Sequence, residues 1–217
     1  MVIKLLRSHG LTISWIVGFL CAVALSYYIA EHPQPIPGEL RFAHWLQERP
    51  LATAAGIGND IAYSPVSVPI GLGLALLSLI RRRLDFAWMF GIAPIIRSAN
   101  GVLKEAIERP RPTDLQLRVT EHASGYSYTS GHTFGSALLL GVAIVCVWRL
   151  NLRRRYQWAA TIVLLLLIAD CGIARVYVGA HWPTDVGGAW LIAALWIGLL
   201  AKIAGLIRLR FGPMDHF

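Results

Sequence analysis

Six apolar runs, each close to the length that crosses a lipid bilayer, constrain what this chain can fold into. They lie at 11–30, 62–80, 86–104, 132–148, 158–174 and 185–201. A spanning helix needs about 20 apolar residues, whereas the strands of a membrane barrel are shorter and alternate apolar with polar residues. Because a spanning segment must also satisfy its own backbone hydrogen bonds, we expect an all-α bundle of six transmembrane helices in one domain over residues 1–217.

The composition supports a bilayer as the solvent of these helices. Hydrophobic residues make up 56% of the chain and charged residues only 15%, which is more apolar than a soluble domain. The first run follows Lys4 and Arg7, as a signal peptide would. It is longer than a signal peptide and lacks a small-x-small cleavage site, so we interpret it as a membrane helix.

The basic residues orient the predicted helices. With the amino terminus inside, twelve Lys and Arg lie on the inner side, seven lie on the outer side, and Arg97 lies within the third helix, which accounts for all 20. This excess follows the positive-inside rule, so we expect both termini in the cytoplasm. The inner residues are Lys4, Arg7, Arg81, Arg82, Arg83, Arg149, Arg153, Arg154, Arg155, Lys202, Arg208 and Arg210, and the outer ones are Arg41, Arg49, Lys104, Arg109, Arg111, Arg118 and Arg175.

Membrane orientation also explains the formal net charge of +8, so we do not expect nucleic acid as a partner. The arginine clusters lie in short turns between apolar helices, where they meet anionic lipid headgroups. The cysteines Cys21, Cys146 and Cys171 fall inside predicted helices without CxxC or Cys/His spacing. We therefore expect free buried thiols, and neither a disulfide framework nor a zinc site.

The predicted topology places two short turns inside, at 81–85 and 149–157, and three loops outside, at 31–61, 105–131 and 176–184. In the first outer loop the segment ELRFAHWLQER places its apolar residues on one side of a helical wheel. We expect a short amphipathic helix that anchors at the membrane surface; the alternative is a lid or guide for a lipid substrate. The apolar side has Phe42, Ala43, Trp45 and Leu46, and the polar side has Arg41, His44, Gln47 and Glu48.

Ionisable residues at a membrane edge are costly and point to function, and three clusters of them lie on the outer side. They are KEAIERPRP at 104–112, Ser-Gly-His at 130–132 and ARVYVGAHWPTD at 174–185. Lys104, Arg111 and Arg175 together suit a dianion, because the guanidinium fork grips phosphate oxygens. Ser130 and Gly131, with the amides that open the fourth helix, add donors at the positive end of its dipole. These residues predict a phosphate-binding site.

Two histidines and an aspartate complete the set needed to cleave a phosphate ester covalently. Asp185 follows His181 by four residues, so its carboxylate can hold the imidazole Nδ1–H and leave Nε2 as the nucleophile. His132 comes from another helix and can protonate the leaving oxygen. The segment Pro183-Thr184-Asp185 also resembles a helix start, so we read Asp185 as an N-cap in addition.

In order and spacing, these three motifs resemble the signature of the type 2 phosphatidic acid phosphatase superfamily. Lys104 is followed after six residues by Arg111-Pro112, then come Ser130-Gly131-His132, and Arg175 is followed by His181 and Asp185. The resemblance implies a metal-independent membrane phosphatase without a cofactor. The residues so assigned are the phosphorylated nucleophile His181, its orienting partner Asp185, the general acid His132, and the phosphate ligands Lys104, Arg111, Ser130, Gly131 and Arg175.

Two positions depart from the family pattern. Thr129 stands where the family has Pro, which we expect to loosen the loop, and Ala174 stands where it usually has Ser, which removes one hydroxyl contact. We expect effects on rate or affinity more than on reaction type.

We interpret the other polar residues as structural and not catalytic. Arg109 falls outside the motif spacing, so we assign it to lipid headgroups or solvent. Arg97, Asn100 and Asp170 lie within helices, where we expect an interior polar network with pairing among them. The isolated histidines His32, His44, His122 and His216 are read as caps or surface groups.

The resemblance also suggests the substrate and the location. It implies a lipid phosphate or diphosphate in a bacterial plasma membrane, with undecaprenyl diphosphate first and phosphatidylglycerol phosphate or phosphatidic acid next, and an active site facing outward. Two alternatives stay open at this point. One is a phosphotransferase that passes the phosphoryl group to another lipid, and the other is a transporter or non-catalytic lipid-binding membrane protein.

Overall fold

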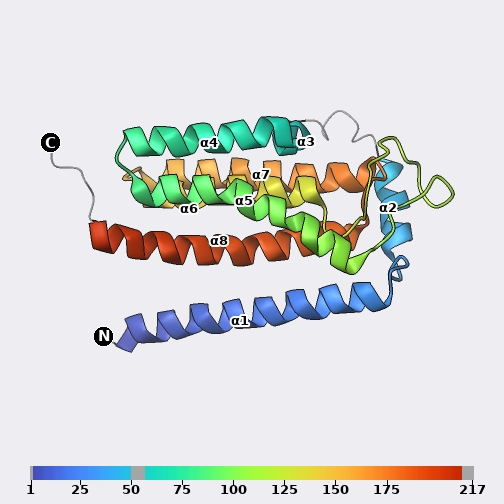
Figure 1. The fold of residues 1–217 in the computed structure, drawn as a ribbon, viewed down its shortest axis with the longest axis horizontal. Coiled ribbons are helices and arrows are strands. Elements are labelled where there is room, and N and C mark those ends of the chain that lie inside the picture. Colours follow the sequence, from blue (N-terminus) through green and yellow to red (C-terminus); the bar gives the residue numbers. More distant parts are fainter. Residues whose placement is uncertain (1, 50–56, 212–217) are drawn as a thin grey trace.

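The computed structural model describes residues 2–49 and 57–211, and these residues form eight helices and no strand (Figure 1). His216, read above as a surface group, lies outside the described residues. The helices are α1 (Val2–Glu31), α2 (Glu39–Gln47), α3 (Ile57–Ala62), α4 (Ser64–Ile80), α5 (Leu84–Ile107), α6 (Gly131–Arg149), α7 (Arg154–Tyr177) and α8 (Pro183–Phe211).

Five of the described helices, α1, α5, α6, α7 and α8, are long and apolar enough to cross a bilayer. The remaining predicted span, 62–80, forms α4, which has 17 residues. At 1.5 Å per residue such a helix is about 25 Å long, slightly less than a hydrocarbon core of about 30 Å. The all-helical membrane prediction is therefore confirmed, whereas the count of six spanning helices is not.

Most helices continue beyond the apolar runs that predicted them. α7 begins at Arg154 and not at 158, and α8 ends at Phe211 and not at 201. A helix keeps satisfying its backbone hydrogen bonds after it leaves the hydrocarbon, so apolar runs underestimate helix length. The short helix α3 was not predicted.

The central helix of the bundle is α6. In its most apolar window 61% of the residues are buried, against 11% for α1 and 17% for α8. Phe134, Leu138 and Val142 of α6 form the main core with Phe86 and Met89 of α5. In contrast, α1 packs against α5 and α8 from outside, and most of its large apolar side chains between Ile13 and Tyr28 are exposed.

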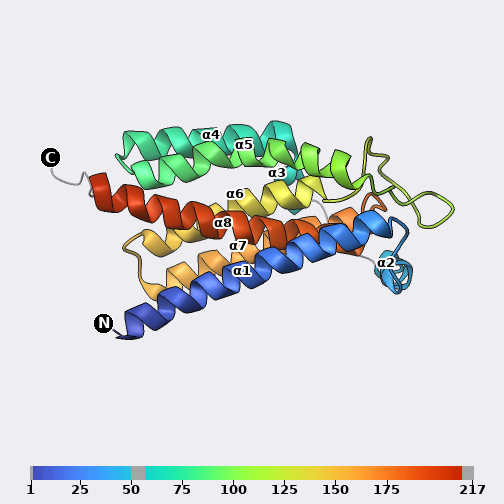
Figure 2. The same ribbon diagram turned by 60° about the horizontal axis from the view of Figure 1, so that its bottom comes forward.

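The connections alternate between the two ends of the bundle (Figures 1 and 2). The start of α1, the end of α8 and the turns at 81–83 and 150–153 lie at one end. The helix α2 and the segments 108–130 and 178–182 lie at the other end. This arrangement agrees with the predicted alternation of short turns and longer loops.

The helix α2 lies across the end of the bundle, and its length agrees with the predicted amphipathic segment (Figure 1). Its apolar side divides into two parts. Ala43 and Leu46 are buried and belong to a cluster that includes Trp182, next to His181, whereas Phe42 and Trp45 are each 48% exposed. The helix thus docks on the protein with one part of its apolar side and presents two aromatic rings with the other.

A close contact joins α8 to the segment that precedes α6. A Cβ atom on Gly188 would lie 2.6 Å from the Tyr128 ring and 2.6 Å from its hydroxyl oxygen, whereas a Cβ on Gly187 would have no neighbour within 4 Å. Tyr128 is fully buried, and its hydroxyl lies 3.1 Å from Ser26 Oγ of α1. Gly188 therefore gives the Tyr128 ring its place beside α8.

Substitution of Gly188 by Ala is expected to lower the free energy of unfolding by about 1–3 kcal/mol, because the new methyl group overlaps the Tyr128 ring. The adjacent Gly187→Ala is the matched control and should be neutral or slightly stabilising, since Ala is the better helix former. Thermal unfolding of both variants in detergent checks the difference. Equal midpoints would contradict the close packing.

Candidate active site

The three sequence motifs meet at one end of the bundle, the end that carries α2 and the 108–130 segment (Figure 1). Lys104 lies in the last turn of α5, and Arg175 lies in the last turn of α7. Ser130 is the N-cap of α6, and Asp185 lies in the first turn of α8. The fold thus gathers the four helix ends that carry the predicted residues.

His181 lies between α7 and α8 with 2% of its surface exposed. Its Nε2 is 3.0 Å from Arg111 Nη1. A guanidinium only donates, so Nε2 accepts this hydrogen bond and the proton of the neutral imidazole is on Nδ1. This is the tautomer that the sequence analysis requires of a nucleophilic Nε2, although Arg111 now occupies that nitrogen.

The Nδ1 atom of His181 faces Ser127 and Asp185 together. It lies 3.3 Å from Ser127 Oγ and 3.6 Å from Asp185 Oδ2. Ser127 Oγ donates a short hydrogen bond to the same carboxylate oxygen, so it can only accept from Nδ1–H. The His181–Asp185 pairing expected from the spacing therefore runs largely through Ser127, which the sequence analysis missed.

Asp185 is fully buried and also caps α8. Its Oδ2 accepts a hydrogen bond of 2.8 Å from the backbone N–H of Trp182. Because α8 begins at Pro183, Asp185 is its third residue and not the N-cap, and the carboxylate reaches back as in a capping box. One side chain thus stabilises the helix start and faces His181.

Arg109 differs most from its sequence-based reading. We assigned it to headgroups or solvent, but it has no exposed surface. Its Nη1 donates to Asp185 Oδ1 at 2.7 Å and its Nη2 to Glu39 Oε2 at 2.6 Å. The assignment was wrong because both carboxylates come from distant parts of the chain, and Glu39 lies on the surface helix α2.

Lys104 and Arg111 mainly bind backbone carbonyls of the segment that precedes α6. These contacts hold the 124–127 segment against the ends of α5 and α7, and Arg111 adds its bond to His181. Burial lowers the pKa of Arg111, and the charge of Asp185 opposes this shift. The bonds run from Lys104 Nζ to Tyr126 O (2.6 Å) and Ser127 O (3.2 Å), and from Arg111 to Gly125 O (2.9 Å), Ser124 O (3.1 Å) and Ala180 O (2.7 Å).

The guanidinium of Arg175 is buried and paired with Glu121. Its Nη1 and Nη2 donate to the two oxygens of that carboxylate at 2.9 and 2.7 Å, and Nη1 also donates to Asn59 Oδ1 at 2.8 Å. The hydrogen bonds from Arg175 lower the pKa of Glu121. Arg175 is therefore paired with a carboxylate that the sequence analysis did not single out.

Ser130 caps the start of α6. Ser130 Oγ accepts from the backbone N–H of Thr133 at 3.4 Å, and Gly131 and His132 form the beginning of the helix. The His132 ring is partly exposed and stacks on Tyr63, with ring centroids 6.4 Å apart. No hydrogen bond joins His132 to His181 or Asp185 among the residues described.

The two departures from the family pattern are both buried. Thr129 Oγ1 donates to Asn100 Oδ1 at 2.6 Å, and Asn100 Nδ2 donates back to Thr129 O at 3.3 Å. This reciprocal pair ties the loop to α5 at Thr129. Ala174 is 1% exposed within α7, beside Arg175.

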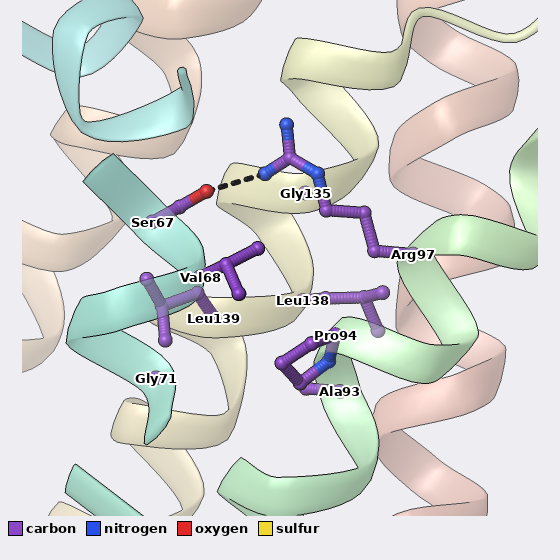
Figure 3. A pocket seen from close by; sticks show the side chains of 9 residues that line it. All are labelled: Ser67, Val68, Gly71, Ala93, Pro94, Arg97, Gly135, Leu138 and Leu139. Carbon is purple, nitrogen blue, oxygen red and sulfur yellow. Dashed lines mark hydrogen bonds between the residues drawn. The ribbon is translucent and has the colours of Figure 1, made fainter. Parts of the chain in front are cut away.

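Arg97 and Asn100 bind different partners, so the expected pairing between them is wrong. Figure 3 shows the Arg97 side chain beside Gly135 of α6, with its guanidinium bonded to Ser67 of α4. A Cβ at position 135 would overlap the guanidinium, so glycine leaves the space that Arg97 occupies. The three acceptors of Arg97 are Ser67 Oγ (2.6 Å), Ser64 Oγ (2.7 Å) and Ala62 O (2.8 Å).

Burial lowers the pKa of His181 to about 3. The positive charges of Arg111 and Lys104 act in the same direction, and Asp185 acts against them. The usual pKa of 6.5 still applies in the unfolded chain. As pH falls below 6.5 the unfolded chain binds a proton that the folded chain does not, so this group lowers stability progressively toward pH 3. At neutral pH the imidazole is uncharged.

Comparison with known proteins gives a family and a fold. A model of the PAP2 superfamily matches residues 82–208, which is more than half of the chain. A transmembrane PAP2 type phosphatidylglycerolphosphate phosphatase from Bacillus subtilis, known from a crystal structure, superposes with a TM-score of 0.70. The alignment covers 89% of this chain and 96% of that one at 22% identity, so it supports the fold.

Three curated relatives are similar in sequence. Phosphatidylglycerophosphatase B of Bacillus subtilis is 32% identical over 70% of this chain and 71% of its own length. An undecaprenyl-diphosphatase of Sulfolobus acidocaldarius is 33% identical over 49% of this chain and 41% of its own. Undecaprenyl-diphosphatase BcrC of Bacillus subtilis is 32% identical over 59% of this chain and 61% of its own.

The neutral Nδ1–H tautomer of His181 is expected to persist from pH 8 to about pH 4, because burial and two neighbouring cations disfavour the imidazolium. The measurement is a pH titration of the 15N-histidine side chains by NMR in detergent, with the His181 signals assigned by their loss in His181→Gln. A midpoint near pH 6.5, or a proton on Nε2, would contradict the arrangement described above.

Proposed function

The chain belongs to the PAP2 superfamily, and on that premise we propose that it is an integral-membrane phosphatase that removes the terminal phosphate from a lipid phosphate or diphosphate. The observation that carries the proposal is His181, a buried neutral imidazole whose Nε2 lone pair is directed at the Arg111 guanidinium. The names of the relatives support the substrate class. We expect undecaprenyl diphosphate first, then phosphatidylglycerol phosphate or phosphatidic acid.

The first step forms a phosphohistidine. His181 Nε2 bonds to phosphorus while the bond between phosphorus and the lipid-side oxygen breaks. His132, which the charge of the bound phosphate keeps protonated, gives its proton to that oxygen. The lipid leaves as an alcohol or a monophosphate. Asp185 stabilises the positive charge that develops on the imidazole, directly and through Ser127.

The second step returns the site to its starting state. A water molecule gives one proton to His132 and bonds to phosphorus, and the bond between phosphorus and Nε2 breaks. Inorganic phosphate is released, and both histidines regain their first protonation states. The same residues thus act in opposite directions in the two steps.

The cations are proposed to bind the phosphate oxygens, where they stabilise the charge of the transferring group. Arg111 must leave Nε2 as phosphorus approaches it, and a phosphate oxygen then replaces the imidazole as its acceptor. Arg175 must likewise exchange the Glu121 carboxylate for phosphate oxygens. Lys104, Ser130 and the amide of Gly131 complete the proposed phosphate site.

The proposed reaction needs no metal ion. The described residues contain no group of three or more His, Cys, Asp and Glu side chains placed to hold one. For the membrane, we propose that α4 also crosses the bilayer, which gives six spans. Both termini are then cytoplasmic, and the active site faces outward, in accordance with the positive-inside rule.

The purified chain is expected to release inorganic phosphate from undecaprenyl diphosphate, phosphatidylglycerol phosphate or phosphatidic acid in detergent with EDTA present. His181→Ala should lower the rate to the background, since the nucleophile is lost. Loss of activity in EDTA would contradict the metal-free mechanism. Transfer of labelled phosphate to another lipid, with no free phosphate, would favour the phosphotransferase.

Glu121→Gln is expected to strengthen binding of the phosphate analogue vanadate about fivefold, because the removed charge competes for Arg175 and repels an anion by about 1 kcal/mol. The measurement is inhibition of phosphate release by vanadate. Asp114→Asn, at an exposed acid of the same loop, is the matched control and should leave inhibition unchanged. Weaker inhibition in Glu121→Gln would show that Glu121 supports the site and does not compete with the anion.

A further inference from the structure

Three buried charges form a chain that leads from the surface helix α2 to the candidate nucleophile. Glu39, the first residue of α2, is 5% exposed, and Arg109 and Asp185 have no exposed surface. Arg109 bridges the two carboxylates with separate nitrogens, at 2.6 Å to Glu39 and 2.7 Å to Asp185. Asp185 in turn faces His181 Nδ1 and binds Ser127.

Thr184 closes this chain into a network. Its hydroxyl donates to Glu39 Oε1 at 2.6 Å and accepts from Arg109 Nη1 at 2.7 Å. Its backbone N–H donates to the same Glu39 oxygen at 2.9 Å. Glu39 therefore holds both the first turn of α8, which carries Asp185, and the guanidinium that binds Asp185.

We propose that Glu39 and Arg109 are positioning residues for the reaction, acting on His181 through Asp185. The proposal rests on the proposed function of His181 as nucleophile. Neither residue reaches the reacting atoms, and Glu39 lies outside the segment 82–208 that the PAP2 superfamily model matches. A helix beyond the matched segment thus supplies part of the catalytic arrangement.

The charges explain why a second carboxylate is needed. Arg109 alone would neutralise Asp185 and weaken its attraction for the imidazolium character that develops on His181. With Glu39 paired to the other guanidinium nitrogen, the three side chains carry one net negative charge. A buried charge acts strongly on its neighbours because little water screens it. Glu39 therefore leaves the negative charge of Asp185 available to His181.

The docking of α2 sets the position of Glu39. Ala43 and Leu46 pack on the cluster that includes Trp182, and Gln47 Nε2 donates to Tyr177 O at 2.9 Å. These contacts fix α2 on the ends of α7 and α8, on either side of His181. Glu39 is thus held by the same packing that surrounds the candidate nucleophile.

The test compares Glu39→Gln with Glu48→Gln, which removes an exposed carboxylate next to the same helix. Phosphate release from a lipid phosphate in detergent is expected to show a kcat about 10-fold lower for Glu39→Gln at an unchanged KM, because the imidazole is held less well for attack. Glu48→Gln should match the wild type. A kcat of Glu39→Gln equal to that of Glu48→Gln overturns the proposal.

Arg109→Lys keeps the buried positive charge but replaces the planar fork with a single ammonium group. It should lower kcat at least as much as Glu39→Gln, and the double variant should be no slower than Arg109→Lys alone, since both residues act through one carboxylate. The proposal is overturned if folded Arg109→Lys keeps the wild-type kcat. It is also overturned if the fold-reduction of kcat in the double variant equals the product of the two single reductions. The thermal unfolding midpoint of each variant shows whether a lower kcat comes from reduced folding stability or from the reaction itself.

An NMR measurement tests the same proposal without activity. The Nδ1–H proton of His181 should shift upfield in Glu39→Gln, because its acceptors become less negative, and should not move in Glu48→Gln. An unchanged resonance would assign Glu39 a purely structural role. If the wild-type chain releases no phosphate from any lipid, the proposed function fails, whereas this spectrum still decides whether Glu39 acts on His181.

Discussion

A fully buried carboxylate at the end of an apolar helix bundle is the constraint on which the rest of this site depends. An ionised Asp185 is stable there only because hydrogen bonds and a positive charge replace the water it has lost. Its partners are Arg109 and Ser127, from the two ends of the 108–130 segment, and the Trp182 N–H just before α8. Satisfying one carboxylate therefore joins the connection between α5 and α6 to the start of α8.

The cations at the same end of the bundle are also paired with acceptors of the protein. Lys104 and Arg111 bind backbone carbonyls, Arg175 binds Glu121, and Arg109 binds two carboxylates. Under the proposed function, a phosphate exchanges these partners and does not enter a site of unpaired charges. The protein acceptors keep the cations in place and neutralise part of their charge, and their replacement is then a step in substrate binding.

Much of the fold and the outline of the site could be predicted from the sequence. Long apolar runs marked the helices, because backbone hydrogen bonding in a membrane leaves few alternatives, and His132, His181 and Asp185 stood out as ionisable residues at membrane edges. Arg109 and Glu39 could not be paired, because the two residues are 70 positions apart and each resembles a surface charge. Ser127 and Glu121 were missed for a similar reason, since a polar loop contains many such residues and only its folded path selects two of them.

The central claim is that the neutral imidazole of His181 forms a covalent bond to phosphorus. Rapid quenching of the protein with a 32P-labelled lipid phosphate, followed by peptide mapping at alkaline pH, measures this directly. We expect acid-labile label on the peptide that contains His181, appearing before free phosphate and then decaying as phosphate accumulates. Label on the peptide that contains His132 would contradict the account. Steady release of phosphate without label on either histidine peptide at any time would contradict it as well.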